Sequence, residues 1–435
     1  MSSSVCIVGG GPAGLTQARV LGELGISYTL FERNADFGGL WNRDDPESPI
    51  YDSAHLISSR TMTGFDAYPM PDSWADYPSG AHILEYIRNF GRDHGIAAHT
   101  RFGETVTSAT PDDNGWSIET SKGAREHYRW LIAANGSNWQ PIIPNWDGMD
   151  GFAGRIRHGA HFKNANDLTG KSVLVVGLGN SGVDIACDAA RTADNVAVSL
   201  RRGYHVIPKH ILGKPADVFA DNSPPLPFPI RQRIFQTLLR VLIGDLGQYG
   251  MPKPDHRLME THPLLNDQFI HHLRHGDIGI LGDITGFDRA EVIFKDGTRR
   301  AFDDVICATG FDWVIPYIDP DLLPWTRGRL APPLAIFPDV PNLFLLSFIE
   351  SNGSSFSLFN AMSRVIGRAI LDARDNPDAY ARLRRLPQTR RFDTTGGLRM
   401  QDTDRHIGYV DNRSYRKALT KLCRIMHWPP IESVN

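Results

Sequence analysis

The chain of 435 residues has little cysteine. Its four cysteines, Cys6, Cys187, Cys307 and Cys423, are far apart in the sequence, and none belongs to a CxxC pair. This spacing argues against a redox-active dithiol and against a zinc site. Three of the four lie in apolar runs, where we expect them to be small core residues.

Long hydrophobic runs and an excess of one charge are also missing. No apolar run reaches the roughly 18 residues of a membrane span, and the first expected strand starts near Val5, which leaves no room for a signal peptide. The formal net charge of -3 gives no electrostatic footprint for nucleic acid or anionic lipid. We therefore expect a cytoplasmic protein with no membrane span and no nucleic-acid partner.

A glycine-rich loop, GGGPAG, occupies residues 9–14. A short apolar run precedes it, and apolar residues at helical spacing follow it as far as Gly25, which predicts a strand, a turn and a helix. The next strand pattern, 28–31, is closed by Glu32, 18 residues after Gly14. This interval is close to the about 20 residues expected of a dinucleotide-binding fingerprint.

The residue types of this first loop suit a dinucleotide. The first glycine makes the tight turn, the second lets the backbone approach a pyrophosphate, and the third allows the helix to pack closely on the strand. The helix N-terminus then offers N–H groups to the phosphates. Glu32 would accept hydrogen bonds from the adenosine ribose and repel a 2′-phosphate, which favours FAD or NAD over NADP. The predicted cofactor-binding residues are Gly9, Gly11, Pro12, Ala13, Gly14, Glu32 and Arg33.

A second loop, GLGNSG at 177–182, repeats this arrangement between a strand pattern and a helix pattern. The strand pattern that follows, 196–200, ends in Arg201 and Arg202, where the first unit ended in an acid. A guanidinium group pairs bidentately with a 2′-phosphate, so this loop is predicted to bind NADPH. The alternative is that both arginines are solvated charges. The predicted cofactor-binding residues are Gly177, Gly179, Asn180, Ser181, Gly182, Ser199, Arg201 and Arg202.

The rest of the chain is less informative. Residues 213–265 are proline-rich, and their amphipathic helix near 230–243 has three arginines and no tryptophan, which favours a packed lid or a subunit contact over a membrane surface. His271 and His275 have metal-ligand spacing, but without an acidic partner the pair is typical of a solvated helix face, and we predict no metal site. The tail from about Leu383 is basic and polar, which predicts a surface extension.

Residues 152–162, FAGRIRHGAHF, connect the two glycine loops and complete a set of motifs. The chain resembles the class B flavin-dependent monooxygenases, because GGGPAG with Glu32, GGLW, GLGNSG, SLRRG and ATGF stand in the order of that family. The connector fits FxGxxxHxxx(Y/F), the fingerprint of the N- and S-oxygenating branch, through Phe152, Gly154, His158 and Phe162. The Baeyer–Villiger branch continues its histidine motif with Trp-Pro, whereas Phe162 and Lys163 stand here.

The resemblance implies an α/β fold with two dinucleotide-binding (Rossmann-like) domains, the NADPH domain being inserted into the FAD domain. The expected bounds are 1–165 for the first part of the FAD domain, 166–304 for the NADPH domain with a helical insert at about 213–265, and 305–435 for the second part of the FAD domain with a C-terminal extension. The resemblance adds Gly39, Leu40, Trp41, Thr309 and Gly310 to the predicted cofactor-binding residues.

The resemblance also implies the chemistry. NADPH reduces FAD, reduced FAD reacts with O2 to give a C4a-peroxyflavin, and one oxygen atom passes to a soft nitrogen or sulfur atom of a small-molecule substrate. Two alternatives remain open, namely Baeyer–Villiger oxygenation of a carbonyl substrate and an NADPH-dependent flavin reductase or oxidase. A third, a non-catalytic nucleotide-binding protein, would leave the second cofactor site without purpose. A homodimer is a further expectation.

One loop departs from part of the family. Where relatives of the trimethylamine oxygenases carry an asparagine, this chain has Ile57, followed by the two candidate catalytic residues, Ser58 and Ser59. The amide credited with steadying the oxygenated flavin is missing, so small amines become doubtful substrates, although plant auxin-forming relatives lack it too. In the connector we expect Phe152 and Gly154 to be structural, and His158 to be a packed hinge residue rather than a proton-transfer group.

Overall fold

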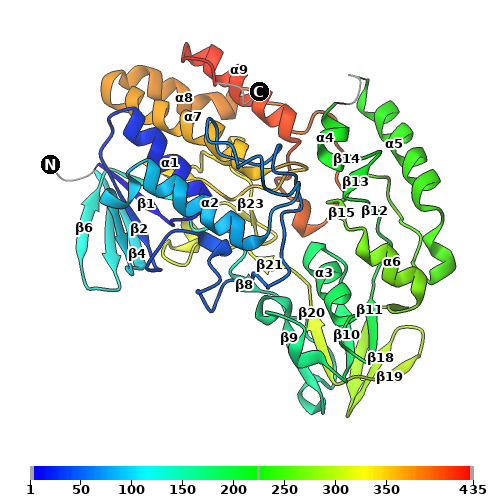
Figure 1. The fold of residues 1–435 in the computed structure, drawn as a ribbon. Coiled ribbons are helices and arrows are strands. Elements are labelled where there is room, and N and C mark those ends of the chain that lie inside the picture. The colour runs from blue at the N-terminus through cyan, green and yellow to red at the C-terminus, as the bar shows by residue number, and fades with distance from the viewer. Residues whose placement is uncertain (1–3, 223–225, 432–435) are drawn as a thin grey trace. The chain divides into compact units, whose positions relative to one another are not determined.

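The computed structural model describes residues 4–222 and 226–431, and the chain divides into two compact units (Figure 1). Unit 1 consists of Met1–Asp45, Arg60–Ser137 and Trp313–Asn435, and unit 2 of Pro46–Ser59 and Asn138–Asp312. The chain thus changes unit after residues 45, 59, 137 and 312, whereas the predicted domain bounds are 165 and 304. The domain bounds stay a prediction, and Ser223, Pro224 and Pro225 of the predicted insert lie outside the described residues.

The parallel sheet of unit 1 has the strand order β24-β7-β1-β2-β3. Its strands are β1 (Val5–Val8), β2 (Tyr28–Glu32), β3 (Thr100–Phe102), β7 (Trp130–Ala133) and β24 (Leu343–Leu345). The central strand β1 is buried along its whole length, as expected of a parallel strand that is covered on both faces. Helix α1 (Pro12–Glu23) follows β1 and packs against α7 (Ser355–Asp375) and α2 (Gly80–Asp93).

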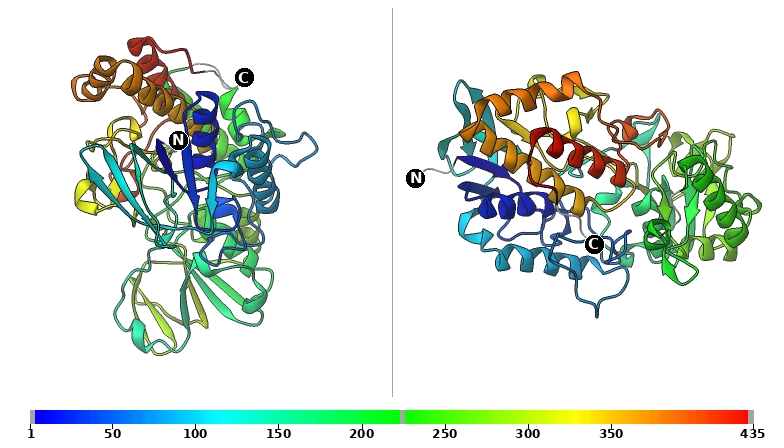
Figure 2. Two further views of the ribbon diagram at one scale, coloured as in Figure 1. Left: turned by 90° about the vertical axis from the view of Figure 1, so that its left-hand side faces the viewer. Right: turned by 90° about the horizontal axis from the view of Figure 1, so that it is seen from above.

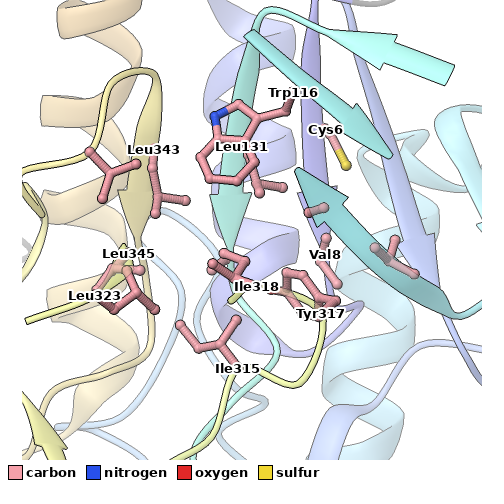
Figure 3. Packing of buried hydrophobic residues seen from close by; sticks show 14 of the residues in the cluster. Cys6, Val8, Trp116, Leu131, Ile315, Tyr317, Ile318, Leu323, Leu343 and Leu345 are labelled. Carbon is pink, nitrogen blue, oxygen red and sulfur yellow. The ribbon is translucent and has the colours of Figure 1, made fainter. Parts of the chain in front are cut away.

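An antiparallel sheet completes the core of unit 1. Its strands are β4 (Val106–Asp112), β5 (Gly115–Thr120) and β6 (Arg125–Tyr128), which pair in chain order as an antiparallel meander. Trp116 of β5 is fully buried in one cluster with Cys6 and Leu131 of the parallel sheet (Figure 3). The same cluster includes Tyr317 and Leu343, so segments from both ends of the chain share this core.

The tail after Leu383 is not the predicted surface extension. Helices α8 (Pro377–Thr389) and α9 (Asn412–Met426) both pack against α7, and Figure 2 shows the three side by side. Tyr415 of α9 is fully buried, and its hydroxyl donates to the carbonyl of Leu334 at 2.5 Å. The prediction was wrong because the apolar residues of α9 recur only every three or four positions, between basic ones that dominate the composition.

Unit 2 repeats the arrangement with the strand order β16-β11-β10-β20-β9. Its parallel strands are β9 (Arg155–His158), β10 (Ser172–Val176), β11 (Asn195–Ser199), β16 (Gly279–Leu281) and β20 (Asp304–Cys307). Helix α3 (Asn180–Ala189) follows β10 as α1 follows β1, and α6 (Gln268–His275) packs against it. The predicted fold class, α/β with two Rossmann-like domains, is therefore confirmed.

The remaining elements of unit 2 are mostly short. The insert contains α4 (Ala216–Asp221), α5 (Phe228–Ile243), β14 (Lys214–Pro215) and β15 (Leu264–Leu265). Just before it, β12 (Val206–Ile207) pairs with β15, and β13 (His210–Ile211) pairs with β14. An antiparallel sheet follows, made of β17 (Ile284–Asp288), β18 (Glu291–Phe294) and β19 (Arg299–Ala301), and β8 (Gln140–Pro141) pairs with β21 (Phe311–Asp312). In unit 1, β22 (Trp325–Thr326) pairs with β23 (Arg329–Leu330). Over the described ranges, no helix is both long and apolar enough to cross a membrane.

The cysteines lie where the sequence predicts them. All four are buried and none forms a disulfide. Burial raises the pKa of Cys187 and of Cys307 to about 12 and that of Cys423 to about 11. Because the thiolate is the reactive form, these thiols are inert packing residues.

Candidate functional site

The first glycine loop is closed by tight backbone contacts. The Gly9 N–H donates to the carbonyl of Phe31 at 2.9 Å, which joins the loop to the end of β2. A Cβ atom on Gly14 would lie 1.9 Å from the Gly9 carbonyl oxygen, so only glycine fits there. Helix α1 then begins with Gly11 as its N-cap and Pro12 as its first residue, and no side chain caps it. The first turn of α1 starts at Pro12 and Ala13, and no side chain occupies its backbone N–H groups. These N–H groups can therefore bind a pyrophosphate.

Glu32 stands beside this loop at the end of β2. Its carboxylate accepts hydrogen bonds from the N–H groups of Gly10 at 2.6 Å and Asn34 at 2.8 Å. Burial raises the pKa of the Glu32 carboxyl, and these two N–H groups act in the opposite direction. Arg33, the next residue, pairs with Asp45 at 2.7 Å. An acid held by the loop backbone can recognise a ribose diol and reject a 2′-phosphate.

The GGLW turn lies against the same loop. The Gly38 N–H donates to the carbonyl of Gly10 at 3.2 Å. A Cβ atom on Gly11 would lie 3.3 Å from the Cα of Gly39, so the two chain segments are in backbone contact. Leu40 and Trp41 follow in a short 3₁₀ turn and are half-buried. The structure thus brings together the two motifs that the sequence assigns to one cofactor.

The second glycine loop has the same geometry as the first. The Gly177 N–H donates to the carbonyl of Ser199 at 3.0 Å, and a Cβ atom on Gly182 would lie 2.3 Å from the Gly177 carbonyl oxygen. Helix α3 begins at Asn180 and Ser181 with Gly179 as its N-cap, again without a side-chain cap. Both loops therefore fit the pyrophosphate of a dinucleotide.

Two arginines follow the strand that ends beside this second loop. The Ser199 hydroxyl donates to the carbonyl of Gly282 at 2.8 Å and fixes the end of β11. Arg201 beyond it is exposed, and Arg202 is half-buried with its guanidinium 5.9 Å from the ring centre of Tyr204. The carboxyl edge of this sheet thus presents cations where the first unit presents Glu32.

The ATGF motif belongs with the second loop. Thr309 and Gly310 follow β20 and fall within unit 2, although the sequence places them in the second part of the FAD domain. Ala308 packs on the loop, because a Cβ atom on Gly177 would lie 2.9 Å from its carbonyl oxygen. The Gly310 carbonyl accepts from the Ile142 N–H at 3.0 Å, and the Thr309 hydroxyl donates to the Ile142 carbonyl. A cofactor contact of either residue stays a prediction.

The connector forms the edge strand β9 of the second sheet. A Cβ atom on Gly154 would lie 2.6 Å from the ring of Phe152, and Phe162 is fully buried. His158 is 2% exposed, and its Nδ1 accepts from the Ala160 N–H at 3.0 Å. These contacts agree with structural roles for Phe152 and Gly154 and with a packed His158.

His158 should make the protein less stable in acid. Burial lowers the pKa of its imidazole to about 4 from an ordinary value of 6.5, so the unfolded chain takes up the proton first as the pH falls. Stability contributed by the neutral ring is therefore lost between pH 6.5 and 4, by about 2 kcal/mol at pH 4.5. Urea unfolding of the wild type and of His158→Asn at pH 7.5 and 4.5 measures this. The variant should lose about 2 kcal/mol less on acidification, while His99→Asn, which changes an exposed histidine, should match the wild type.

Of the two candidate catalytic residues, Ser59 is hydrogen-bonded to another side chain of the protein. Ser59 is 1% exposed, and both its N–H and its hydroxyl donate to Asp217, at 2.6 and 3.0 Å. Ile57 and Ser58 are half-buried. The structure therefore gives Ser59 a clear anchoring contact, and a catalytic role for either serine stays a prediction.

The histidines of α6 and the face of α5 complete the predicted features. His275 contacts the carbonyl of His271 through Nδ1 at 2.8 Å, and the described ranges contain no group of three or more His, Cys, Asp or Glu placed to hold a metal ion.

On α5, Ile230, Ile234 and Val241 are 50%, 55% and 77% exposed. The lid or subunit contact assigned to this helix stays a prediction.

Sequence reasoning missed two carboxylates on α3. Asp184 and Asp188 lie on the helix that starts at the second loop and hold Tyr51 and Ser53. Acids four residues apart within an otherwise apolar helix are a signal that could have found them, because buried carboxylates need partners.

Known proteins resemble this chain in sequence and in fold. The sequence model of a family described as flavin-binding monooxygenase-like matches residues 2–404. Human flavin-containing monooxygenase 5 is 29% identical over 384 residues, which cover 83% of this chain and 72% of that protein. The indole-3-pyruvate monooxygenase YUCCA6 of Arabidopsis thaliana is 32% identical over 326 residues, which cover 71% of this chain and 76% of that protein. A solved structure, the flavin-containing monooxygenase from Stenotrophomonas maltophilia, has a TM-score of 0.66 at 20% identity and covers 86% of this chain and 99% of that one.

Proposed function

The chain belongs to the flavin-binding monooxygenase-like family, and from this premise we propose that it transfers one oxygen atom of O2 to a soft nitrogen or sulfur atom of a small organic molecule. It is an FAD-dependent NADPH monooxygenase, so it needs a site for each dinucleotide. The observation that carries the proposal is the pair of glycine loops of equal geometry with opposite charges beside them. Glu32 follows the first, and Arg201 and Arg202 follow the second.

The chain's own residues have binding and shielding tasks. Bound FAD, once reduced by NADPH, reacts with O2 and supplies the oxygen atom. In unit 1, the first-turn N–H groups of α1 would hold the FAD pyrophosphate, and Glu32 would accept hydrogen bonds from its ribose. In unit 2, the first turn of α3 would hold the NADPH pyrophosphate, and Arg201 and Arg202 would pair with its 2′-phosphate.

The connector supports oxygenation of nitrogen or sulfur. Its histidine motif ends in a fully buried Phe162 followed by Lys163, where the Baeyer–Villiger branch has Trp-Pro. No carboxylate pair or nucleophile is needed, because a soft heteroatom lone pair attacks the activated oxygen directly.

A second candidate is oxygenation of a carbonyl substrate. Ile57 stands where trimethylamine oxygenases have an asparagine, and plant auxin-forming relatives lack that asparagine too. The 32% identity with an indole-3-pyruvate monooxygenase favours this candidate. A substrate panel of a thioether, a tertiary amine, a cyclic ketone and an aromatic 2-oxo acid separates the two.

The test begins with anaerobic reduction of the FAD-loaded protein by NADPH, followed by rapid mixing with oxygenated buffer. The proposal expects a transient near-ultraviolet band before the spectrum of oxidised flavin returns, and faster decay of that band with the thioether or amine. Direct return of oxidised flavin with one hydrogen peroxide per NADPH would identify a reductase or oxidase instead. Faster decay with the ketone or 2-oxo acid alone would favour the second candidate.

A further inference from the structure

Residues 46–59, called here the linking segment, belong to unit 2, although unit 1 residues precede and follow them in the sequence. The start of the segment is fixed to the residue after the connector. The Asp52 N–H donates to the carbonyl of Lys163 at 2.8 Å, and the Lys163 ammonium group donates to the carbonyl of Ser48. The start of the segment is therefore held in unit 2 by two hydrogen bonds.

Two carboxylates on one face of α3 hold the middle of the linking segment. The Tyr51 hydroxyl donates to Asp184 at 2.7 Å, and the Ser53 hydroxyl donates to Asp188. The two acids are four residues apart, which puts them on the same side of the helix. Asp184 also accepts from the side-chain amide of Asn266 at 2.8 Å, so its position does not depend on the segment alone.

A third carboxylate holds the end of the segment. Asp217, in the first turn of α4, accepts both the N–H and the hydroxyl of Ser59. Hydroxyl or N–H donors at three points of the segment thus meet three carboxylates of unit 2. Removing one donor would take a hydrogen bond from a half-buried carboxylate.

Burial strengthens these contacts. Tyr51 is 7% exposed, and its ring packs edge-on against Phe162 with 6.0 Å between the ring centres. Burial, and after it the charge and hydrogen bond of Asp184, raise the pKa of Tyr51 well above its ordinary value, so the hydroxyl keeps its proton. Burial also raises the pKa of the Asp184 and Asp188 carboxyls.

The linking segment also touches the predicted NADPH loop. The side chain of Ser181, the second residue of α3, interacts with the Tyr51 hydroxyl and acts to lower its pKa. Asp184 lies about one turn further along the same helix. The contacts of Tyr51 therefore begin in the turn whose backbone N–H groups would face the NADPH pyrophosphate.

We propose that Tyr51 and Ser53, held by Asp184 and Asp188, are positioning residues that couple the order of the linking segment to the binding of NADP+. The identity of that ligand rests on the proposed function. A ligand that fixes the first turn of α3 also fixes the acids to which the segment is bound. By thermodynamic linkage, an ordered segment then strengthens the binding of the ligand. Ser58 and Ser59 at the end of the segment are ordered with it.

Hydrogen–deuterium exchange of the FAD-loaded protein, with and without NADP+, tests the coupling. In the wild type, NADP+ should slow exchange within residues 46–59. In the double variant Tyr51→Phe, Ser53→Ala, this protection should be lost and NADP+ should bind about tenfold more weakly, because two hydrogen bonds to carboxylates are removed. More of the NADPH consumed should also appear as hydrogen peroxide. Ser53→Thr, which keeps a hydroxyl, should preserve most of the protection.

Tyr68→Phe is the matched control. It also removes a tyrosine hydroxyl from an aspartate, Asp93 at 2.5 Å, but within unit 1. It should leave the exchange of residues 46–59 and the NADP+ affinity unchanged. The proposal is overturned if NADP+ does not alter exchange in the wild-type segment, or if the double variant matches the wild type in both exchange and affinity.

These outcomes are separate from those of the oxygenation test. Exchange and NADP+ binding require no oxygen transfer, so protection without the transient near-ultraviolet band would refute the proposed function alone. A normal band with an unresponsive segment would refute only the positioning role.

Discussion

Protein carrying Gly14→Ala should be purified without bound flavin, whereas the wild type should retain FAD. The added methyl group would lie 1.9 Å from the carbonyl oxygen of Gly9, and backbone cannot yield as a flexible side chain can. Helix α1 must therefore move away from β1, and its first-turn N–H groups leave the place of the pyrophosphate. Such a clash costs about 4 kcal/mol, so the dissociation constant of FAD should rise about 1,000-fold. Flavin absorbance per protein and titration of apoprotein with FAD measure the loss.

Gly22→Ala on the same helix is the control for Gly14→Ala. A Cβ atom on Gly22 meets no atom within 4 Å, so this variant should keep its flavin. It should also be slightly more stable, by about 0.5–1 kcal/mol, because alanine favours a helix more than glycine does. Equal flavin content in the two variants would contradict the assignment of the first loop.

Gly182→Ala separates the two sites. Its methyl group would lie 2.3 Å from the Gly177 carbonyl oxygen, in the second loop. This variant should retain FAD but lose reduction by NADPH, while dithionite still bleaches the flavin. Loss of FAD from Gly182→Ala, with circular dichroism unchanged, would mean that the second loop holds the flavin.

The local parts of this structure could be predicted from the sequence. Each glycine loop is specified by a strand, a turn and a helix within about 30 residues, and the nearest contacts of Gly14 and Gly182 lie within their own loops. The charge after the second strand, Glu32 in one unit and Arg201 in the other, stands at a fixed spacing from its loop. Periodicity and spacing are enough for such features.

Contacts between distant segments could not be predicted in this way. The linking segment has one tyrosine among short polar and apolar residues. Nothing local in its sequence shows that Tyr51 bonds to Asp184, 133 residues later. Thr309 and Gly310 likewise lie beside the second loop because β20 pairs with β10. The packing of helix α9 was missed for a related reason. Its apolar residues are buried because α9 packs against α7, which is distant in the sequence. In each case the partner, not the segment, fixes the role.

Replacing both Arg201 and Arg202 with alanine should change the cofactor preference of the protein. Guanidinium groups at the end of β11 would pair with the 2′-phosphate, which NADH lacks. Each hydrogen-bonded charge contact is worth roughly 1.5–3 kcal/mol, so the Michaelis constant for NADPH should rise about 100-fold and that for NADH less than about threefold. Rates of anaerobic flavin reduction over a range of each nucleotide measure both constants.

The arginine prediction depends on a difference between two nucleotides, which separates recognition from general electrostatics. A loss of positive charge alone would weaken NADPH and NADH together, and more so at low salt. Arg300→Ala, which changes an exposed arginine of β19 in the same unit, supplies the control and should leave both constants unchanged. An equal rise for both nucleotides in the Arg201→Ala, Arg202→Ala protein would make these arginines solvated charges. A selective rise would place the 2′-phosphate at the end of β11, where the first unit has Glu32 and favours a dinucleotide without that phosphate.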